Sequence, residues 1–205
     1  MYKHEDLAHN YKEKVLILIQ GIIDDILAIQ KCSNNSVKIN AVINAFIEAK
    51  KLTFNKNKCH KIHIQKNSKQ VEDCHKLKVH NDEMHDSQRE KYLGDIVDRS
   101  GKIRKTIEDR KSKGYGIVSE ILAIINEIPL GQFRIEIGQK LREAMLVNSM
   151  LFNSEAWHGI SENEIRILET VDEHLLRALV GGHAKTPLEF LYLESGSVPI
   201  RYLIS

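Results

Sequence analysis

Two adjacent carboxylates, Asp24 and Asp25, lie between two short apolar runs, residues 15–19 and 26–29. Adjacent acidic side chains at the tip of a buried hairpin repel each other, and a divalent cation relieves that repulsion. The pair therefore makes a metal site the first hypothesis. Aspartate is also a common turn residue, so a solvated hairpin turn without a metal is the alternative interpretation.

The cysteines and histidines that follow residue 58 form a second set of residues able to do chemistry. Zinc accepts thiolate and imidazole ligands, so a structural zinc site is one hypothesis for this segment. The spacings match neither a Cys-x-x-Cys pair nor the usual zinc-finger pattern, which favours scattered, exposed histidines in a lysine-rich loop. The set consists of Cys59, His60, His63, Cys74, His75, His80 and His85.

Lysines are concentrated in residues 50–78, where nine of them are opposed by only two acidic residues. Such a segment is a candidate surface for the phosphates of a nucleic acid, and a solvated lysine-rich loop is the alternative. The whole chain has 30 basic and 28 acidic residues, so its net charge of +2 does not by itself indicate a nucleic-acid partner.

The three cysteines, Cys32, Cys59 and Cys74, make no even-numbered disulfide framework, and no secretory signal precedes them. We therefore expect a reducing, intracellular compartment, with nucleus and cytoplasm not distinguished. The longest uninterrupted apolar run has five residues. Because a span of the bilayer needs roughly 20 apolar residues, no membrane partner is expected.

The elements that position the N-terminal residues are predicted from their apolar patterns. Residues 15–29 predict two short strands in a hairpin, because the runs are rich in valine and isoleucine and too short for helices. From Ser36 onward, apolar residues at helical spacing predict an amphipathic helix packed under this hairpin, with Ser36 as its cap. Residues 52–66 are expected to return to the sheet as a strand.

The middle of the chain changes character twice. Residues 66–90 have few apolar positions, so we expect a polar, flexible connection there. Residues 92–97 predict one short strand, which a turn at residues 98–101 would end. Residues 102–205 predict an all-helical region.

Several local signals place the ends of these C-terminal helices. Pro129 and Gly131 separate the first two helices, and Ser161 with Glu164 forms a capping box for a helix that ends at Gly181 and Gly182. Thr186 is expected to cap the next helix, with Pro187 in its first position and Glu189 reaching back. Trp157 is interpreted as a core anchor in preference to a stacking surface for a base.

Three segments in order carry a resemblance to a known family. They are the Asp24-Asp25 hairpin, the stretch Leu52-Thr53-Phe54-Asn55-Lys56-Asn57-Lys58, and Tyr92-Leu93-Gly94. Together they resemble the palm of reverse transcriptases of non-LTR retrotransposons: the x-x-Asp-Asp motif, the helix-to-strand motif that follows it, and the strand leading out of the palm. The region from residue 114 to 205 is similar to the thumb-side and downstream regions, so the resemblance covers residues 12–205.

The resemblance implies an RNA-directed DNA polymerase, a nucleotidyltransferase that uses two Mg²⁺ ions and binds an RNA or DNA primer-template. Asp24 would be a metal ligand, Asp25 its supporting partner, and Lys58 a cation near the phosphates of the incoming nucleotide. An ordinary surface lysine is the alternative for Lys58.

The fold class implied is α+β, with a small antiparallel palm-like sheet and its packed helix before an all-helical region. The expected parts are a partial palm (1–65), the polar connection (66–90), a palm-exit strand and turn (91–101), and a thumb-like and connection-like helical region (102–205).

The chain departs from the family pattern at two points. Ile22 stands where the family usually has tyrosine or phenylalanine, and only 23 residues precede Asp24, where these polymerases place fingers and another metal-binding aspartate. Asp6 has no recognisable context as a replacement. We therefore expect a polymerase fragment that is not catalytically complete alone and binds nucleic acid weakly. The alternative is a non-enzymatic helical interaction or nucleic-acid-binding protein derived from a retroelement, which forms homo-oligomers or joins a missing polymerase fragment.

Overall fold

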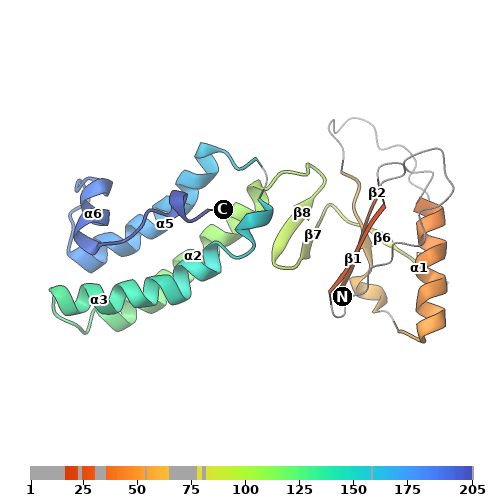
Figure 1. Ribbon diagram of the computed structural model, residues 1–205, viewed down its shortest axis with the longest axis horizontal. Coiled ribbons are helices and arrows are strands. Elements are labelled where there is room, and N and C mark those ends of the chain that lie inside the picture. The colour runs from red at the N-terminus through yellow and green to blue at the C-terminus, as the bar shows by residue number, and fades with distance from the viewer. Residues whose placement is uncertain are drawn as a thin grey trace. The chain divides into compact units, whose positions relative to one another are not determined.

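The computed structural model describes residues 17–22, 25–30, 36–53, 55–64, 78–79, 82–157 and 159–204. The chain divides into two compact units, which are described separately. The N-terminal unit comprises residues 1–63 and 67–87, and the helical unit comprises residues 64–66 and 88–205. The fold is α+β in the coarse sense expected, because short strand pairs occur along with a mainly helical C-terminal region (Figure 1).

The N-terminal unit contains the predicted β-hairpin. Strand β1 (Ile17–Ile22) pairs with strand β2 (Asp25–Gln30) in an antiparallel ladder that starts at Ile17 opposite Gln30 and ends at Ile22 opposite Asp25. Branched apolar side chains favour extended backbone, which explains why these short runs form strands. The hairpin predicted from residues 15–29 is confirmed (Figure 1).

Helix α1 (Ser36–Lys50) confirms the helix predicted after the hairpin. Ile47 is fully buried, whereas Val42 and Phe46 on the predicted apolar face are 57% and 49% exposed. The helix ends with Lys51 in a left-handed conformation, with φ of 53°. This conformation lets the N–H of the next residue donate to the Ile47 carbonyl (3.0 Å), a helix end more often built on glycine. The expected capping side chain of Ser36 lies outside the described part.

Short strands follow within the polar stretch 66–90. Strand β4 (Lys78–Val79) pairs antiparallel with strand β5 (Asp82–Glu83). The amide of Asn44 on α1 donates to the carbonyl of Lys78 (2.8 Å), so a helix side chain holds the start of this strand pair. The described part of the stretch thus includes regular backbone pairing that its few apolar residues did not predict.

The strand predicted over residues 52–66 is wrong in length and in partner. Only β3 (His60–Lys61) is extended in the described part of that range, and it pairs in parallel with β6 (His85–Asp86) instead of with the hairpin. The prediction rested on Ile62 and Ile64, and Ile64 is 58% exposed. Two apolar residues in alternation bury too little surface to hold a strand against a sheet.

The helical unit begins with a second hairpin, formed by β7 (Arg89–Tyr92) and β8 (Asp95–Asp98). The single strand predicted over residues 92–97 is therefore wrong. Leu93 and Gly94 have φ of 48° and 91° and form the turn between Tyr92 and Asp95. Positive φ at both positions is the geometry of a two-residue hairpin turn, in which glycine is favoured.

The predicted turn at residues 98–101 is confirmed. The N–H of Gly101 donates to the Asp98 carbonyl (3.0 Å), and the N–H of Ser100 donates to the Asp98 carboxylate (2.9 Å). Gly101 has φ of 63°, and helix α2 (Arg104–Ile125) starts three residues later.

The predicted all-helical region is confirmed, and α2 and α3 are separated around Pro129 and Gly131 as expected. The segments α3, η3 and α4 form one continuous helical run, whose middle part η3 is π-helical. After α2, the elements are α3 (Gln132–Leu141), η3 (Arg142–Val147), α4 (Asn148–Met150), η4 (Ser154–Ala156), α5 (Glu162–Val180), α6 (Leu188–Ser195) and η5 (Ile200–Tyr202).

The core of the helical unit lies where α5 packs on α2, α3 and α6 (Figure 1). Two glycines permit close helix contacts: a Cβ on Gly114 would lie 2.9 Å from the Met150 sulfur, and one on Gly138 would overlap the Leu179 side chain. Trp157 is 5% exposed in this core, which confirms its interpretation as an anchor. No helix within the described ranges combines the length and apolarity needed to cross a bilayer.

Helix α5 has the ends that its sequence predicts. The Ser161 hydroxyl accepts from the Glu164 N–H, and the Glu164 carboxylate accepts from the Ser161 N–H (2.8 Å), which completes the capping box. At the other end Gly181 has φ of 69°, and the Gly182 N–H donates to the Arg177 carbonyl (2.8 Å). Both ends therefore satisfy backbone groups that a helix leaves unpaired.

Thr186 does not cap α6, contrary to the prediction. The helix starts at Leu188, Pro187 occupies the cap position, and no described side chain caps it. The backbone of Thr186 is held instead by the preceding turn: its N–H donates to the His183 carbonyl (2.9 Å) and its carbonyl accepts from Arg177 (2.9 Å). A side chain from α5 thus holds the backbone just before α6.

Candidate functional site

The acidic pair belongs to the β1–β2 hairpin. The final pair of the ladder joins Ile22 to Asp25, so β2 starts at the second carboxylate of the pair. Asp24 and the side chain of Asp25 lie outside the described part of the chain. The described backbone shows a hairpin whose second strand starts at Asp25, and the metal-binding roles of Asp24 and Asp25 stay predictions.

Lys58 lies at the end of a short turn of 3₁₀-helix, η2 (Lys56–Lys58). Its N–H donates to the Asn55 carbonyl (2.9 Å), and the Asn57 N–H donates to the Asn55 side-chain oxygen (3.1 Å). This local turn holds the backbone while the Lys58 side chain is exposed. Its ammonium group has no carboxylate partner within the described residues, so an external anion has access to it.

The two residues after Lys58 interact with the same turn. The Cys59 thiol lies 3.4 Å from the Asn55 carbonyl oxygen, and the His60 Nε2 lies 2.8 Å from the Asn57 carbonyl oxygen. Burial raises the pKa of the Cys59 thiol, which disfavours the thiolate that zinc requires. These contacts suit a structural role for Cys59 and His60.

Strand pairing brings together two histidines that are far apart in the sequence. In the β3–β6 ladder His60 lies opposite His85, and His63 follows with its Nε2 buried and without a hydrogen-bond partner among the described residues. Within the same ranges, no group of three or more histidine, cysteine or acidic side chains is placed to hold a metal ion. Cys74, His75 and His80 of the zinc hypothesis lie outside the described ranges.

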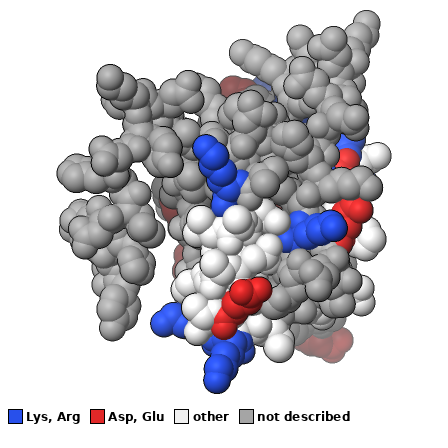
Figure 2. All heavy atoms as spheres, turned by 90° about the vertical axis from the view of Figure 1, so that its right-hand side faces the viewer, with Lys and Arg blue, Asp and Glu red and all other residues white. Residues whose placement is uncertain are grey.

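The lysine-rich segment 50–78 contributes exposed cations to the N-terminal unit. Lys50, Lys51, Lys58 and Lys78 are all exposed. Figure 2 shows one face of this unit, on which the described basic and acidic side chains surround an uncharged area. The described atoms on that face therefore form a mixed surface, without a continuous basic patch.

The helical unit has a buried cation that the sequence analysis missed. The Arg110 guanidinium, 6% exposed, bridges the β7–β8 turn and the end of α4. It donates to the Gly94 carbonyl (3.1 Å), the Asp95 carboxylate (3.1 Å) and the carbonyls of Ser149 and Phe152 (both 3.3 Å). The Phe152 ring lies 5.5 Å from the guanidinium carbon, which adds a cation–π contact.

Further hydrogen bonds fasten this hairpin to the helices. The Asn153 amide donates to the second Asp95 oxygen (2.5 Å), and the Thr106 hydroxyl accepts from the Ile96 N–H (2.8 Å). Asn153 has φ of 65°, a left-handed conformation that asparagine tolerates. The turn of the predicted Tyr-Leu-Gly segment is therefore held by residues from α2 and from the turn after α4.

A second buried network joins the helical run at Arg142 with α5 and α6. Arg142 donates two bonds to Asp172 (2.5 and 2.7 Å) and a third to the Val198 carbonyl (2.9 Å). The Tyr192 hydroxyl donates to Asp172 (3.1 Å). Burial and the neighbouring Asp172 carboxylate raise the pKa of Tyr192, so its hydroxyl stays protonated. Every member of this network has a partner, as buried charged groups require.

The sequence contains a signal for both the Arg110 network and the Arg142–Asp172 network: a charged residue at an apolar position of the helical repeat. Asp172 lies between Val171 and Leu175 on the apolar face of a strongly capped helix, and Arg110 follows Ile107 in the same way on α2. A charge at a core position requires a buried partner. The position of each charged residue in the helical repeat therefore predicts that it has a buried partner, although it does not predict which residue that partner is.

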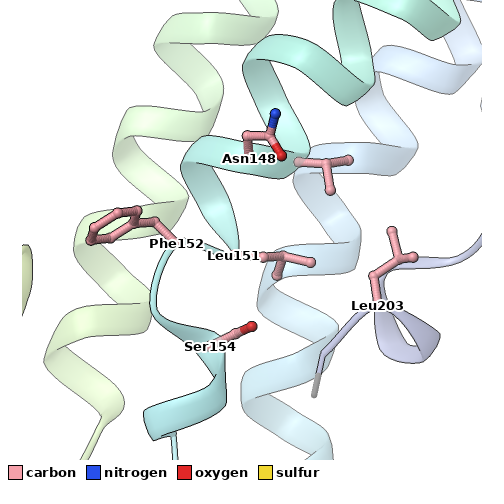
Figure 3. Close-up of a pocket in the computed structure, with 6 residues that line it drawn as sticks. Asn148, Leu151, Phe152, Ser154 and Leu203 are labelled. Atoms are coloured by element: carbon pink, nitrogen blue, oxygen red, sulfur yellow. The ribbon is translucent and has the colours of Figure 1, made fainter.

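A hollow of about 530 Å³ opens beside the end of α4. Figure 3 shows Leu151 pointing toward Leu203, whereas Phe152 points away from both. The other lining residues of the hollow are Val147, Asn148 and Ser154. The lining that the structure describes contains no charged side chain, so it suits an apolar group and offers no acid–base chemistry.

The hollow beside α4 and the two buried networks do not include any of the residues predicted from the sequence to be catalytic. Asp24, Asp25 and Lys58 all belong to the N-terminal unit, whereas the hollow and both networks belong to the helical unit. Comparison with protein-family models, with curated proteins and with solved structures finds no match to the chain.

Proposed function

We propose that this chain is a reverse transcriptase-like segment of a retrotransposon RNA-directed DNA polymerase. The observation that supports the proposal is the β1–β2 hairpin, whose ladder ends at Asp25, the second residue of the acidic pair. Asp24 binds Mg²⁺ in this proposal, Asp25 supports it, and Lys58 neutralises phosphate charge on the incoming nucleotide. A hairpin holds carboxylate oxygens in a fixed relation, which suits the octahedral geometry that Mg²⁺ requires.

The same chemistry limits what the 205-residue chain does by itself. Nucleotidyl transfer through two metal ions needs enough carboxylates to hold both ions next to the reacting phosphate. The hairpin provides one set, and no upstream aspartate in this sequence has the context of the other. The chain alone is therefore expected to bind Mg²⁺ and a primer-template weakly and to extend no primer.

Binding of Mn²⁺, used as a spectroscopic substitute for Mg²⁺, tests the role of the hairpin. Replacing Asp24 by asparagine should weaken Mn²⁺ binding by about tenfold or more, because the neutral amide is a poorer ligand for a hard cation. Titration followed by electron paramagnetic resonance measures the free ion. Asp86→Asn removes the same charge from another strand of this unit and should leave the affinity within about twofold.

Equal Mn²⁺ affinity for the original chain and Asp24→Asn would contradict the proposed metal role. Primer extension on a homopolymer template provides a second readout. Robust extension by the 205-residue chain would show that it has a complete two-metal site, contrary to the proposal. Absent extension with hairpin-dependent Mn²⁺ binding is the expected combination.

A second candidate function is a non-enzymatic interaction module, which the apolar surface of the helical unit favours. Leu193 on α6 is 80% exposed and Phe133 on α3 is 66% exposed. Large apolar side chains with this exposure gain free energy when a partner covers them. Self-association through these helices is the simplest form of this function.

Light scattering coupled to size exclusion tests self-association. The original chain should then show a mass that rises with concentration, and Phe133→Ser with Leu193→Ser should restore the monomer mass because less apolar surface is available for burial. Tyr202→Ser, at a side chain 75% exposed, is the matched control and should leave the assembly unchanged. A monomer at all concentrations would contradict this second function.

A further inference from the structure

Charge is unevenly distributed in the helical unit. Residues 89–113, which form the β7–β8 hairpin and the first half of α2, contain nine basic and five acidic residues. Residues 114–205 contain seven basic and twelve acidic residues. The first segment is therefore positive and the remainder negative, although the whole chain is nearly neutral.

Ion pairs within the positive segment leave an excess of positive charge. Glu108 is shared by two cations, with Arg104 Nε at 3.1 Å and Lys105 Nζ at 2.9 Å. One carboxylate cannot neutralise both groups. These two cations lie in the first turn of α2, which contains no acidic residue, so the helix dipole adds to the positive potential.

Asp109 is shared in the same way between α2 and the hairpin. Its carboxylate lies 2.7 Å from Lys113 Nζ and 3.8 Å from Lys91 Nζ. The Lys113 side chain lowers the pKa of Lys91, which reflects the crowding of two ammonium groups around one carboxylate. An additional anion at this place would relieve their repulsion.

Lys111 adds a further cation to the positive segment of α2. It follows Arg104 by seven residues and therefore lies on the same side of the helix as Arg104, whereas Lys113, nine residues after Arg104, lies near the opposite edge of the exposed face of α2. Its ammonium group lies 6.0 Å above the ring of Tyr115, and that ring makes an edge contact with His174 at 6.0 Å between centroids. Within the described residues Lys111 has no carboxylate partner, and the exposed Lys102 lies just before the helix.

We propose that these cations bind the phosphate backbone of a nucleic acid. The cationic surface is defined by Lys91, Lys102, Arg104, Lys105, Lys111 and Lys113. Protein partners usually require buried apolar anchors, whereas nucleic-acid interfaces are polar and strongly positive. Among the described residues, Tyr115 is the one large apolar side chain exposed along this part of α2, which favours a nucleic acid over an acidic protein.

This inference rests on the proposed function for the choice of ligand, and it adds a contact that is independent of the hairpin metal site. Phosphate contacts of this kind are insensitive to sequence and weaken as salt rises, because binding releases counterions. They need no divalent ion. Binding in EDTA therefore reports the cationic surface, and binding of Mn²⁺ reports the hairpin.

Fluorescence anisotropy with a labelled RNA–DNA hybrid duplex in EDTA tests the surface in the full chain. Replacing Lys91, Lys111 and Lys113 together by glutamine should weaken binding roughly tenfold and reduce the salt slope by about 0.9 for each phosphate that is no longer neutralised. The control replaces three cations of the acidic remainder, Lys140, Arg166 and Lys185, by glutamine. It removes the same net charge and should change the affinity by less than about twofold.

The fluorescence of Trp157 would report whether the triple substitution disturbs folding. If it does, a second variant still tests the proposal. Asp109→Asn removes the shared carboxylate and should tighten duplex binding, because the local excess of positive charge rises. Equal weakening by the two triple variants, weaker binding by Asp109→Asn, or no binding of the hybrid in EDTA would each overturn the proposal. Mn²⁺ binding to the hairpin is measured separately from duplex binding in EDTA, so failure here and failure of the metal site are distinguishable.

Discussion

Replacing Asp172 by leucine should lower the free energy of unfolding of the helical unit by about 3–5 kcal/mol. Asp172 is fully buried on α5 and accepts two bonds from Arg142, which is 2% exposed. Without the carboxylate, the Arg142 charge remains in the core with only the Val198 carbonyl as a partner among the described residues. The cost of an unpaired buried charge greatly exceeds that of removing a surface pair.

Trp157 provides a selective measurement of this destabilisation. It is the only tryptophan in the sequence and lies in the core of the helical unit, so its fluorescence during urea unfolding reports that unit. Glu173→Ala, which removes a partly exposed pair with Arg177, is the neighbouring control. That change should cost less than about 1 kcal/mol.

A triple variant separates the charge effect from the packing effect. Arg142→Met, Asp172→Leu and Tyr192→Phe together replace the whole network by apolar groups of similar size. Such replacements are often neutral or stabilising, so most of the stability should return. If the triple variant is as unstable as Asp172→Leu alone, packing at α5 and not the unpaired charge explains the effect.

Arg110→Met should have the second largest effect, a decrease of about 2–4 kcal/mol in the free energy of unfolding. The substitution keeps an apolar stem of similar length and removes a guanidinium that serves three backbone carbonyls and Asp95. Among the described residues, the Asp95 carboxylate would then keep only the Asn153 amide as a side-chain partner. The β7–β8 turn should therefore detach from the helices before the rest of the unit unfolds.

Hydrogen exchange of the β7–β8 amides measures this detachment, and Trp157 fluorescence measures the whole unit. Arg166→Met is the control, because Arg166 is exposed on α5. It should change stability by less than about 0.5 kcal/mol. Arg110→Lys should not restore protection, since an ammonium group lacks the planar fork that reaches several acceptors at once. Full protection in Arg110→Lys would show that charge alone holds the hairpin.

Local patterns were sufficient to predict the elements that depend on neighbours in the chain. The valine- and isoleucine-rich runs of residues 15–29 form their hairpin, and α1 follows from Ser36. The capping box at Ser161 and the glycine end at Gly181 are present because every group involved lies within a few residues of its partner. Their geometry depends little on the rest of the fold.

The wrong predictions concern segments whose partners lie far away. Residues 52–66 were expected to join the hairpin, yet β3 pairs with β6 more than twenty residues later. Thr186 was expected to cap α6, yet Pro187 occupies the cap position, and the Thr186 carbonyl accepts a hydrogen bond from Arg177 on α5. In both cases a tertiary contact outweighs a weak local preference, because propensities amount to about 1 kcal/mol or less.

By itself, the sequence determined the hairpin that contains the acidic pair, most of the C-terminal helices and the ends of α5. Only the tertiary structure decided that Arg142 binds Asp172 and that Arg110 holds the Gly94 turn, since these partners are 30 and 16 residues apart. The tertiary structure also places the ammonium groups of Lys91 and Lys113 next to the same carboxylate, that of Asp109. Helical phase shows that a charge faces the core, but its partner depends on which helices pack together and at what distance.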